Sequence, residues 1–436
     1  MQNLAEVRLW NNTVGALLYD PVSKISTFEY APSWIKQGCE IAPLRMPIST
    51  QKYQFPGLNP ETFKGLPAIF ADTLPDDFGN AVINAWLARN GRSSDNFTPL
   101  ERLLYTGNRG MGALEFAPAL RHDETIENFE LASLVEMAQQ VLDQRNDVTT
   151  TINPKHQDDE AMLALMQIGT SAGGARAKAL IAINSDRTEI RSGQLDAPSG
   201  FEHYLLKFDG VEEHKINSET FGDPKGFGRM EYAYYLMAKD CGITISNSEL
   251  LLEGNRAHFI TKRFDRDGNR KRHVVSLCAI DHADYKKPGA YSYEGLLSVA
   301  RRLSLPRKDA IEIFRRMVFN LISRNHDDHT KNTSFILDKA DSQWRLSPAF
   351  DLAYSYKKGS PWVNSHQMSV NGKRENFKRD DILQVATLIG NFKKKEANQM
   401  IDEITSVVNN WNDYAKKAGV FKKLAYEIKQ NHELSI

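Results

Sequence analysis

The sequence predicts an α+β protein with two lobes and an additional β-rich subdomain at the N-terminus. Segments with strand-like alternation are gathered early in the chain, segments with helical periodicity follow late, and a single hairpin lies between them. A repeated βαβ fold would alternate the two patterns. With 436 residues, the chain is also too long for one hydrophobic core. We therefore expect a β-rich lobe followed by a mostly helical C-terminal lobe.

Composition and charge narrow the class of protein. Hydrophobic residues make up 41% of the chain and charged residues 25%, which is typical of a folded globular protein. Lys and Arg together number 55, as do Asp and Glu, so no overall field attracts nucleic acid or an anionic membrane. The chain shows neither a signal-peptide pattern nor an apolar stretch that could cross a bilayer. We expect a soluble, cytoplasmic protein with no membrane partner.

The first strands alternate apolar and polar residues and end at turn residues. They are expected at residues 7–10, 14–19 and 25–30. An amphipathic helix is expected after Pro75, because apolar residues recur there at helical spacing. The glycine cluster at 107–112 fits a tight turn better than a phosphate loop, since short glycine motifs are weak signals.

The main domain boundary is expected in a charged stretch with one helical pattern. That pattern covers residues 130–142 and is followed by a run of Thr, Asn and Pro. We divide the chain into an N-terminal subdomain, a helix with a linker, a lobe with a glycine-rich loop, and a helical lobe. These parts are expected at residues 1–120, 121–160, 161–280 and 281–436, respectively.

Beyond this boundary the pattern is first that of a β-rich lobe. A glycine-rich turn at residues 169–178 leads into an apolar strand. The next expected elements are a strand at 203–208, a helix at 230–239, and a hairpin of 257–264 with 272–277. From Tyr293 onward helices dominate, interrupted by a short hairpin before residue 347.

A polar cluster at residues 324–332 is the most informative stretch. It follows an amphipathic helix that begins at Pro306, so a rigid element presents a loop of polar side chains. Asp327 and Asn332 have the spacing D-x-x-x-x-N, which in protein kinases sets the Asp against the substrate hydroxyl and the Asn on Mg²⁺. Asp351 follows the short hairpin, where a second Mg²⁺ ligand is expected. The pattern predicts Asp327 as catalytic base and Asn332 and Asp351 as metal ligands.

Earlier residues supply the other parts of a nucleotide site. Lys207 is a lone lysine in an apolar strand, where an ammonium group is costly unless it meets an anion such as an ATP phosphate. Glu231, at the start of the next helix, is expected to form a structural pair with Lys207. The glycine-rich turn offers backbone N–H groups to phosphate oxygens.

Each of these features also has a structural explanation when taken alone. A D-x-x-x-x-N match is common by chance, a strand lysine often carries its charge to solvent, and an acid at a helix start complements the dipole. Their order favours the functional interpretation, because glycine loop, Lys, Glu, hairpin, D-x-x-x-x-N and Asp follow one another as in protein kinases. The order therefore predicts a protein-kinase-like fold that uses ATP and Mg²⁺.

The same segments resemble the HipA family of toxin kinases over nearly the whole chain. The resemblance is carried by the hairpin at Val14-Gly15 and by residues 28–34, 72–76, 262–266, 327–332, 347–351 and 368–372. It implies a serine/threonine protein kinase that is the toxin of a toxin–antitoxin system, inhibits growth or translation and contributes to persistence. Implied partners are a HipB-like DNA-binding antitoxin, DNA only through that complex, and a protein substrate, for which an aminoacyl-tRNA synthetase is one candidate.

The resemblance also implies which residues contact ATP. They are Gly173, Gly174, Ala175, Arg176, Ala177, Lys178, Lys207, the hinge residues Lys262, Arg263 and Phe264, the loop residues His329, Thr330, Lys331 and Asn332, and Phe350 with Asp351. Ser171 matches the serine that family members autophosphorylate, and Thr170 is a second candidate. A phosphate there would add a charge of about −1.5 to −2 inside the ATP loop and oppose nucleotide binding.

Two positions depart from the best-known family members. Asp328 stands in place of a glycine, and the extra carboxylate could act on the base or join the metal shell. Lys262 stands in place of a glutamate, which puts side-chain contacts of the hinge in question but leaves its backbone contacts as expected.

Two other functions stay open on the sequence alone. One is a metal-dependent phosphohydrolase that uses His326, Asp327, Asp328 and His329, although no further ligands at fixed spacing can be assembled. The other is a non-catalytic corepressor subunit, since basic runs such as 393–395 could help a complex touch DNA. Such runs are more often solvated helix faces.

Overall fold

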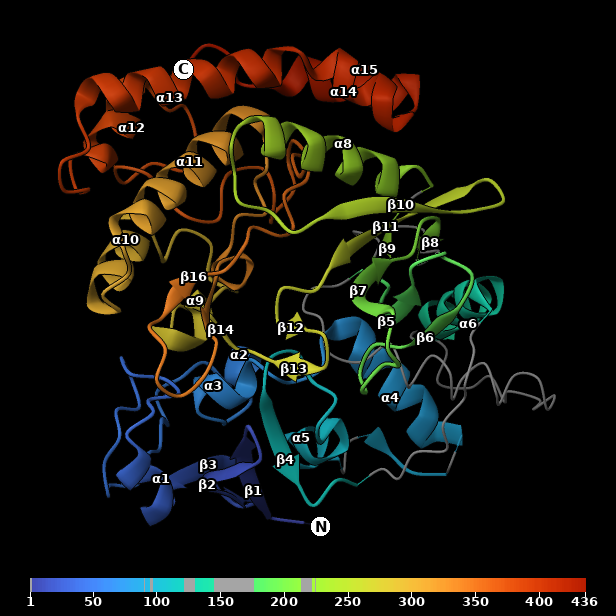
Figure 1. Cartoon of the computed structure of the whole chain (residues 1–436), viewed down its shortest axis with the longest axis vertical. Coiled ribbons are helices and arrows are strands. Elements are labelled where there is room, and N and C mark those ends of the chain that lie inside the picture. The colour runs from blue at the N-terminus through green and yellow to red at the C-terminus, as the bar shows by residue number, and fades with distance from the viewer. Residues whose placement is uncertain are drawn as a thin grey trace. The chain divides into compact units, whose positions relative to one another are not determined.

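The computed structural model describes residues 2–89, 91–94, 97–120, 130–144, 176–212, 222–223 and 225–436. It divides into two compact units (Figure 1). The first unit is made of Met1–Cys39, Ile48–Gly228 and Asn247–His273, and the second of Glu40–Pro47, Arg229–Ser246 and Val274–Ile436. The first unit takes in the N-terminal region and most of the expected β-rich lobe, and the boundaries of the four expected domains stay a prediction.

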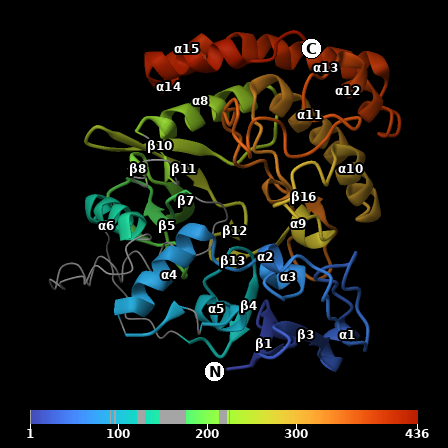
Figure 2. The same ribbon diagram turned by 180° about the vertical axis from the view of Figure 1, so that it is seen from behind.

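The first unit begins with a four-stranded antiparallel sheet in the order β3-β2-β1-β4. Its strands are β1 (Leu4–Leu9), β2 (Asn12–Asp20), β3 (Ile25–Tyr30) and β4 (Leu114–Ala117). Gly15 is required where β2 meets β3, because a Cβ there would lie 2.2 Å from the Glu29 carbonyl oxygen. The short helices around this sheet are α1 (Pro32–Gln37), α2 (Pro60–Phe63), α3 (Ala68–Ala71) and α5 (Pro99–Thr106). Both ribbon views show α5 and β4 beside β1 (Figures 1 and 2).

A second, five-stranded sheet of the first unit has the order β10-β11-β7-β5-β6. Its strands are β5 (Lys178–Asn184), β6 (Ile190–Ser192), β7 (Phe201–Lys207), β10 (Ser248–Glu253) and β11 (Arg256–Lys262). Helices α4 (Asp77–Arg89) and α6 (Leu131–Gln144) pack their apolar residues against β5 and β7 in one continuous core. Each fully buried aliphatic or aromatic side chain in it stabilises the fold by about 1.5–3 kcal/mol. The helix predicted after Pro75 therefore belongs to the core of this sheet.

The predicted hairpin around residue 268 is correct at its tip and wrong for its long strands. The tip is formed by the two-residue strands β12 (Arg266–Asp267) and β13 (Arg270–Lys271). Strand β11 pairs instead with β7 and with β10, a strand that was not predicted. Strand β14 (His273–Ser276) joins a separate sheet, β14-β15-β16. The chain thus leaves one sheet and enters another at the point where the sequence suggested a single ribbon.

The second unit is mostly helical, as predicted. Its helices are α8 (Phe227–Asp240, which begins at the end of the first unit), α9 (Leu277–Ile280), α10 (Tyr293–Arg302), α11 (Arg307–Ser323), α12 (Arg379–Ala386), α13 (Lys394–Asn409), α14 (Trp411–Ala418) and α15 (Lys422–Asn431). The predicted short hairpin is β15 (Ser334–Leu337) with β16 (Arg345–Leu346). Buried Tyr234 of α8 ties this unit together, because its ring packs on Trp411 and its hydroxyl donates to the Ser323 carbonyl at 2.6 Å. Remaining short strands are β8 (Val211–Glu212) and β9 (Gly222–Asp223) in the first unit.

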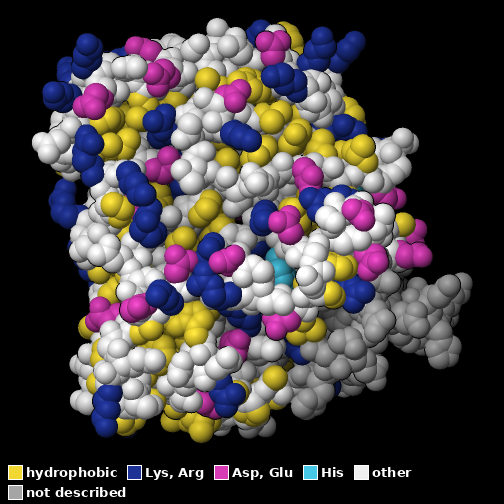
Figure 3. Space-filling model, in the orientation of Figure 1, with side chains coloured by type: hydrophobic (Ala, Val, Ile, Leu, Met, Phe, Trp, Pro, Cys, Tyr) yellow, Lys and Arg dark blue, Asp and Glu magenta, His cyan; other side chains and the backbone are white. Residues whose placement is uncertain are grey.

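Surface and core agree with the compositional expectations. Basic and acidic side chains are interspersed on the face drawn in Figure 3, as the balanced charge suggested. All three cysteines are buried. Among the described residues, no helix combines the length and apolar character that crossing a bilayer requires.

Candidate active site

The polar cluster predicted to carry chemistry is held by the most deeply buried helix of the second unit. Helix α11 buries most of its last three turns and ends at Arg324, which takes a left-handed conformation with φ 59° and caps the helix on the Asn320 carbonyl. The Arg324 side chain donates to Glu433 at 2.9 Å and to the Asn431 carbonyl at 2.8 Å. The loop of residues 324–332, called the catalytic loop below, therefore starts from a fixed point.

Asp327 lies in this loop with its carboxylate partly accessible. Its side chain is 34% exposed, and Oδ1 accepts a hydrogen bond of 2.7 Å from the indole Nε1 of Trp362. His329 Nε2 lies 3.7 Å from the same oxygen. A general base has to reach the proton it removes, and this exposure permits it.

Asn332 closes the loop onto Asp327. It ends a short 3₁₀ turn, η2 (Thr330–Asn332), and its Nδ2 donates to the Asp327 carbonyl at 2.8 Å. Because the amide nitrogen is used in that bond, the amide oxygen is turned elsewhere, and Asn332 lines a pocket together with Asp351. The neighbours are placed by local contacts. Thr330 donates to the Ala283 carbonyl at 2.5 Å, and the Lys331 ammonium lies 5.1 Å from the Tyr285 ring centroid.

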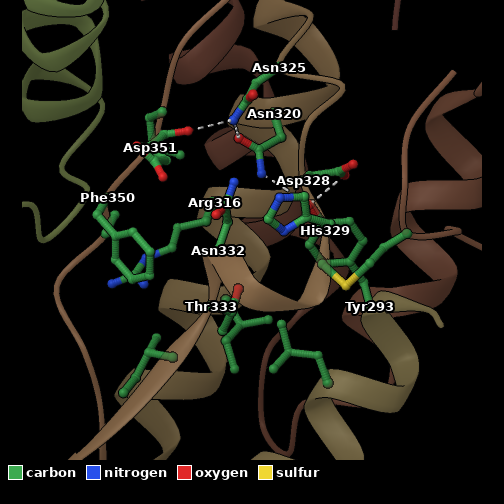
Figure 4. Close-up of a pocket in the computed structure, with 16 residues that line it drawn as sticks. Tyr293, Arg316, Asn320, Asn325, Asp328, His329, Asn332, Thr333, Phe350 and Asp351 are labelled. Atoms are coloured by element: carbon green, nitrogen blue, oxygen red, sulfur yellow. Dashed lines mark hydrogen bonds between the residues drawn. The ribbon is translucent and has the colours of Figure 1, made fainter. Parts of the chain in front are cut away.

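Asp351 reaches the same pocket from the other side of the β15–β16 hairpin (Figure 4). Buried Arg316 of α11 donates to the Ser347 carbonyl at 2.8 Å, and Ala349 N donates to the Thr244 carbonyl at 2.7 Å. Asp351 itself has a left-handed backbone, φ 53°, and its carbonyl accepts a 3.4 Å hydrogen bond from Asn325. Phe350 lines the pocket beside it. Asn332 and Asp351 thus line one pocket, and Asn332 also contacts the Asp327 backbone, while the roles that the spacing predicts for the three residues stay a prediction.

Asp328 plays a different part from the one considered for it. It is buried, and both of its carboxylate oxygens are occupied: Oδ2 accepts from the Tyr293 hydroxyl at 2.8 Å and from His366 Nδ1 at 3.0 Å, and Oδ1 accepts from Gln367 N at 2.7 Å. Burial, and then the Asp328 charge, raise the pKa of Tyr293 well above its ordinary value. Asp328 thus anchors the catalytic loop to the residues that follow Asp351.

His326 is turned into the interior as well. Its ring is fully buried, Nδ1 lies 3.1 Å from the Val363 carbonyl, and it stacks on His366 with 4.1 Å between ring centroids. Burial and the neighbouring His366 lower the pKa of His326 to about 2. No group of three or more His, Cys, Asp and Glu side chains in the described part of the chain is arranged to hold a metal ion. This arrangement gives the phosphohydrolase alternative no support.

Of the lysines predicted to contact ATP, Lys207 and Lys178 are buried in the first unit. Lys207 of β7 stands directly opposite Lys178 of β5, and its ammonium lies 5.9 Å from the Phe259 ring centroid. Lys178 Nζ lies 3.5 Å from Asp76 Oδ2. Burial raises the pKa of Asp76 although Lys178 opposes that shift. Contact of these two lysines with ATP stays a prediction.

The hinge residues have side chains that are mostly engaged in the first unit. Arg263 is buried and pairs with Asp265 at 2.7 Å, and Lys262 pairs with Glu202. The backbone N–H groups of Lys262 and Arg263 donate to the carbonyls of Asn247 and His203 at 2.8 and 2.9 Å. Phe264 is half-buried, and its carbonyl accepts from Arg272 at 3.0 Å. Contact of this segment with adenine through its backbone groups stays a prediction.

The structure describes only some of the remaining residues predicted for the nucleotide site. Arg176 is half-buried, and Ala177 is buried with its carbonyl accepting from Phe208 N at 3.1 Å. Glu231 is a buried residue of α8 and belongs to the second unit, whereas Lys207 belongs to the first, so their pairing stays a prediction. Ser171, Thr170, Gly173, Gly174 and Ala175 lie outside the described residues.

Sequence reasoning missed Trp362, His366 and Asn325. Trp362 lies 35 residues after Asp327, in a polar stretch without periodicity, so no spacing rule connects the two. An aromatic residue isolated in such a loop is the one signal that could have singled it out. Asn325 was part of the quoted cluster, but its role in holding Asp351 depends on tertiary structure.

The fold and the pocket together define a class of protein. The α+β chain has a helical unit in which Asn332 and Asp351 line one pocket and Asn332 bonds to the backbone of Asp327, in the order that is typical of a protein-kinase-like fold. The family description "HipA-like C-terminal domain" matches residues 170–411, and "HipA N-terminal domain" matches residues 5–117. The chain belongs to the HipA family. The predicted fold class and the resemblance to this family are confirmed.

Solved structures agree at the level of the fold. The Shewanella oneidensis MR-1 HipA, solved in a complex with HipB and operator DNA, has a TM-score of 0.66 and 16% sequence identity to this chain. That likeness covers 98% of this chain and 95% of the Shewanella chain. The proinflammatory kinase CtkA of Helicobacter pylori has a TM-score of 0.31 and 14% identity over 52% of this chain and 92% of its own. That second likeness is too weak to support a conclusion.

Proposed function

We propose that this chain is an ATP-dependent serine/threonine protein kinase and the toxin of a toxin–antitoxin pair. The observation that carries the proposal is the convergence of Asp327, Asn332 and Asp351 in the second unit, where Asn332 contacts Asp327 and shares a pocket with Asp351. Membership of the HipA family supports the same conclusion.

Asp327 acts as the general base. Its exposed carboxylate accepts the proton of a substrate hydroxyl while the hydroxyl oxygen forms a bond to the γ-phosphorus of ATP. The bond between the γ-phosphorus and the bridging oxygen breaks, and ADP leaves with the electron pair. No covalent intermediate on the protein is needed, so positioning by the catalytic loop carries most of the catalysis.

The donor set around the pocket fits Mg²⁺. Asn332 offers an amide oxygen because its nitrogen is already bonded, and Asp351 offers a carboxylate, and such hard oxygen ligands are those that Mg²⁺ prefers. When bound, the ion would neutralise the charge that develops on the phosphate oxygens. Asn325 and Arg316 hold this rim of the pocket through the backbone carbonyls of residues 351 and 347, respectively.

The first unit would bind the nucleotide phosphates. Buried Lys207 and Lys178 stand opposite each other on neighbouring strands, and Lys178 pairs with Asp76. The residues proposed for the glycine-rich loop and the hinge complete this site. Ser171 is the proposed autophosphorylation site, with Thr170 as its competitor, and phosphopeptide mapping of Ser171→Ala against Thr170→Ala would distinguish the two.

A HipB-like DNA-binding antitoxin is the proposed partner, and contact with DNA is proposed only through that complex. Support comes from the Shewanella HipA, which was solved with HipB and its operator DNA. A protein acceptor is proposed as substrate, and an aminoacyl-tRNA synthetase is one candidate. Phosphoproteomics shortly after induction of the chain would identify the acceptor.

The decisive experiment is phosphate transfer by the purified chain from γ-labelled ATP with Mg²⁺. We expect labelled protein and ADP, and a loss of about 10²- to 10⁴-fold in rate for Asp327→Asn. Asp341→Asn is the matched control, because Asp341 lies in the exposed β15–β16 turn and should leave the rate unchanged. Released phosphate without labelled protein would instead indicate a phosphohydrolase. Toxicity that survives in folded Asp327→Asn would indicate a non-catalytic corepressor.

A further inference from the structure

Three consecutive residues of the catalytic loop hold one and the same segment. We call residues 360–367 the strap. His326 contacts the Val363 carbonyl, Asp327 accepts from Trp362, and Asp328 accepts from His366 and from the backbone of Gln367. The outer two contacts involve His326, Asp328 and His366, which are all buried. The central contact is the one that reaches the reactive carboxylate.

The backbone of Trp362 is held by the side chains of Ser360 and Gln367. The Ser360 hydroxyl accepts from the N–H groups of Trp362 and Val363, both at 3.1 Å, and the Gln367 side chain donates to the Trp362 carbonyl. Trp362 is only half-buried, so its ring is not a core residue of the second unit. A rigidly held, partly exposed indole that spends its single donor on a carboxylate needs an explanation beyond packing.

The hydrogen bond from Trp362 occupies one carboxylate oxygen of Asp327 and leaves the other available. The indole Nε1 lies 2.7 Å from Asp327 Oδ1, which is a charge-assisted hydrogen bond, and His329 approaches the same oxygen. The Asn332 amide holds the Asp327 backbone from the other end. With both ends of the residue fixed, rotation of the carboxylate is restricted, and Oδ2 is the oxygen that remains to meet a substrate hydroxyl.

We propose that Trp362 is a positioning residue, which orients the general base Asp327 for phosphoryl transfer by donating its indole N–H to Oδ1. The proposal rests on the function proposed above. It assigns the strap a share in the reaction through its hydrogen bond to Asp327. A base that swings freely loses near-attack geometry, and a displacement of about 1 Å can cost on the order of 10²-fold in rate.

The test uses the full chain and the variant Trp362→Phe, which keeps an aromatic ring and removes the N–H donor. We expect the autophosphorylation rate constant at saturating ATP and Mg²⁺ to fall about 10- to 100-fold, as for a lost hydrogen bond to a charged group. The ATP concentration for half-maximal rate and the affinity for Mg²⁺–ADP by calorimetry should stay unchanged. A merely structural role would raise the half-maximal ATP concentration, weaken the affinity for Mg²⁺–ADP and lower the melting temperature.

Trp411→Phe is the matched control, since Trp411 is a buried tryptophan of the same unit whose indole donates to the Ala425 carbonyl at 2.8 Å. It should lower the melting temperature and leave the rate constant within about twofold. A Trp362→Phe rate within twofold of the wild type would overturn the proposal. So would a faster rate, which would mean that the indole blocks the base.

A second readout does not depend on activity. In ¹⁵N-tryptophan-labelled protein, the indole signal that disappears in Trp362→Phe should shift in Asp327→Asn, while the Trp411 indole signal should not. An unchanged Trp362 signal would contradict the hydrogen bond between Trp362 and Asp327. A wild type that incorporates no phosphate but shows this shift would instead refute the proposed kinase function, so the two failures can be told apart.

Discussion

Asp265 in the first unit and Asp327 in the second are both carboxylates of short polar motifs, but their surroundings are opposite. Asp265 is fully buried and accepts from Arg263, Arg266 and the Gly112 backbone at 2.7–2.9 Å. Asp327 keeps a third of its side chain exposed, and its Oδ1 accepts a single indole N–H. A buried charge is tolerated only when it is well paired, whereas a base must keep an oxygen accessible. Full pairing marks the carboxylate that holds the fold, and partial pairing marks the one that can react.

The arginine–aspartate cluster, residues 263–266, also holds the glycine turn at 107–112 in place through hydrogen bonds. Arg266 donates to the carbonyls of Gly110 and Gly112 at 3.2 and 3.0 Å, and Gly112 N donates back to Asp265. The motif that suggested a nucleotide hinge thus also links the N-terminal sheet region to the five-stranded sheet within the first unit. The tight-turn interpretation of the glycine cluster is supported by these contacts.

The largest effect is expected from Asp265→Asn. The change leaves two buried guanidinium groups close together without their shared carboxylate, and breaking a buried pair costs about 3–5 kcal/mol. The free energy of unfolding from denaturant titration would measure it. Asp267→Asn is the control, because Asp267 is an exposed neighbour that should leave the midpoint unchanged. A small loss for Asp265→Asn would break the comparison, since full pairing would then not imply a structural role.

Asp328→Asn sharpens the comparison inside the catalytic loop. Asp328 is as fully paired as Asp265, so we expect it to act structurally, with a loss of about 1.5–3 kcal/mol from the weakened bonds to Tyr293 and His366. Asp327→Asn next to it should leave the unfolding free energy nearly unchanged while abolishing activity. Equal stability losses for the two variants would contradict the distinction.

The pH dependence of the free energy of unfolding should reveal the contribution of Asp265. Burial raises the pKa of Asp265, but Arg263 and Arg266 outweigh that effect and hold it well below its ordinary value. As pH falls, Asp265 is therefore protonated in the unfolded chain before it is protonated in the folded chain. Its contribution to the free energy of unfolding is full above about pH 4. Below that it is lost at about 1.4 kcal/mol per pH unit. The stability difference between the wild type and Asp265→Asn should be constant from pH 8 to 5 and shrink below pH 4. A difference that grows on acidification would refute the assignment.

The smallest effect is expected for Lys262→Ala. The Lys262–Glu202 pair is nearly half-exposed on both sides, at 43% and 45%, so its loss should cost less than about 1 kcal/mol. The hydrogen bond from Lys262, and then that from Tyr204, lower the pKa of Glu202. A double-mutant cycle with Glu202→Ala would measure the pair. Calorimetry with Mg²⁺–ADP should show unchanged affinity, because any contact of this residue with adenine is expected through its backbone.

Local patterns were sufficient for most elements of the fold. The three N-terminal strands, the helices after Pro75 and Pro306, and the β15–β16 hairpin lie where periodicity and turn residues predicted them. Strand β10 was missed because its apolar run is short and continuous. The long hairpin was misjudged because its two strands look adjacent in sequence, while their pairing is decided by which sheet each can bury itself in.

The candidate site was predictable only in the residues that obey a spacing rule. Asp327, Asn332 and Asp351 could be singled out because the phosphoryl-transfer chemistry fixes their order along the chain, and their roles stay a prediction. Trp362, the Asp328–His366 pair and the Lys178–Asp76 pair join segments far apart in sequence, and no local pattern encodes such contacts. The extra carboxylate of Asp328 is likewise held by Tyr293, His366 and Gln367, which its position in the sequence did not reveal.

The positive φ of Asp351 has a consequence for reading natural variation at this position. Asparagine, aspartate and glycine adopt that backbone shape more readily than other residues, for which it costs about 1–2 kcal/mol. An asparagine or glycine here would therefore preserve the contour of the pocket wall even after the negative charge is gone. Alanine would alter contour and charge at once, so Asp351→Asn is the substitution that removes the charge and keeps the bend.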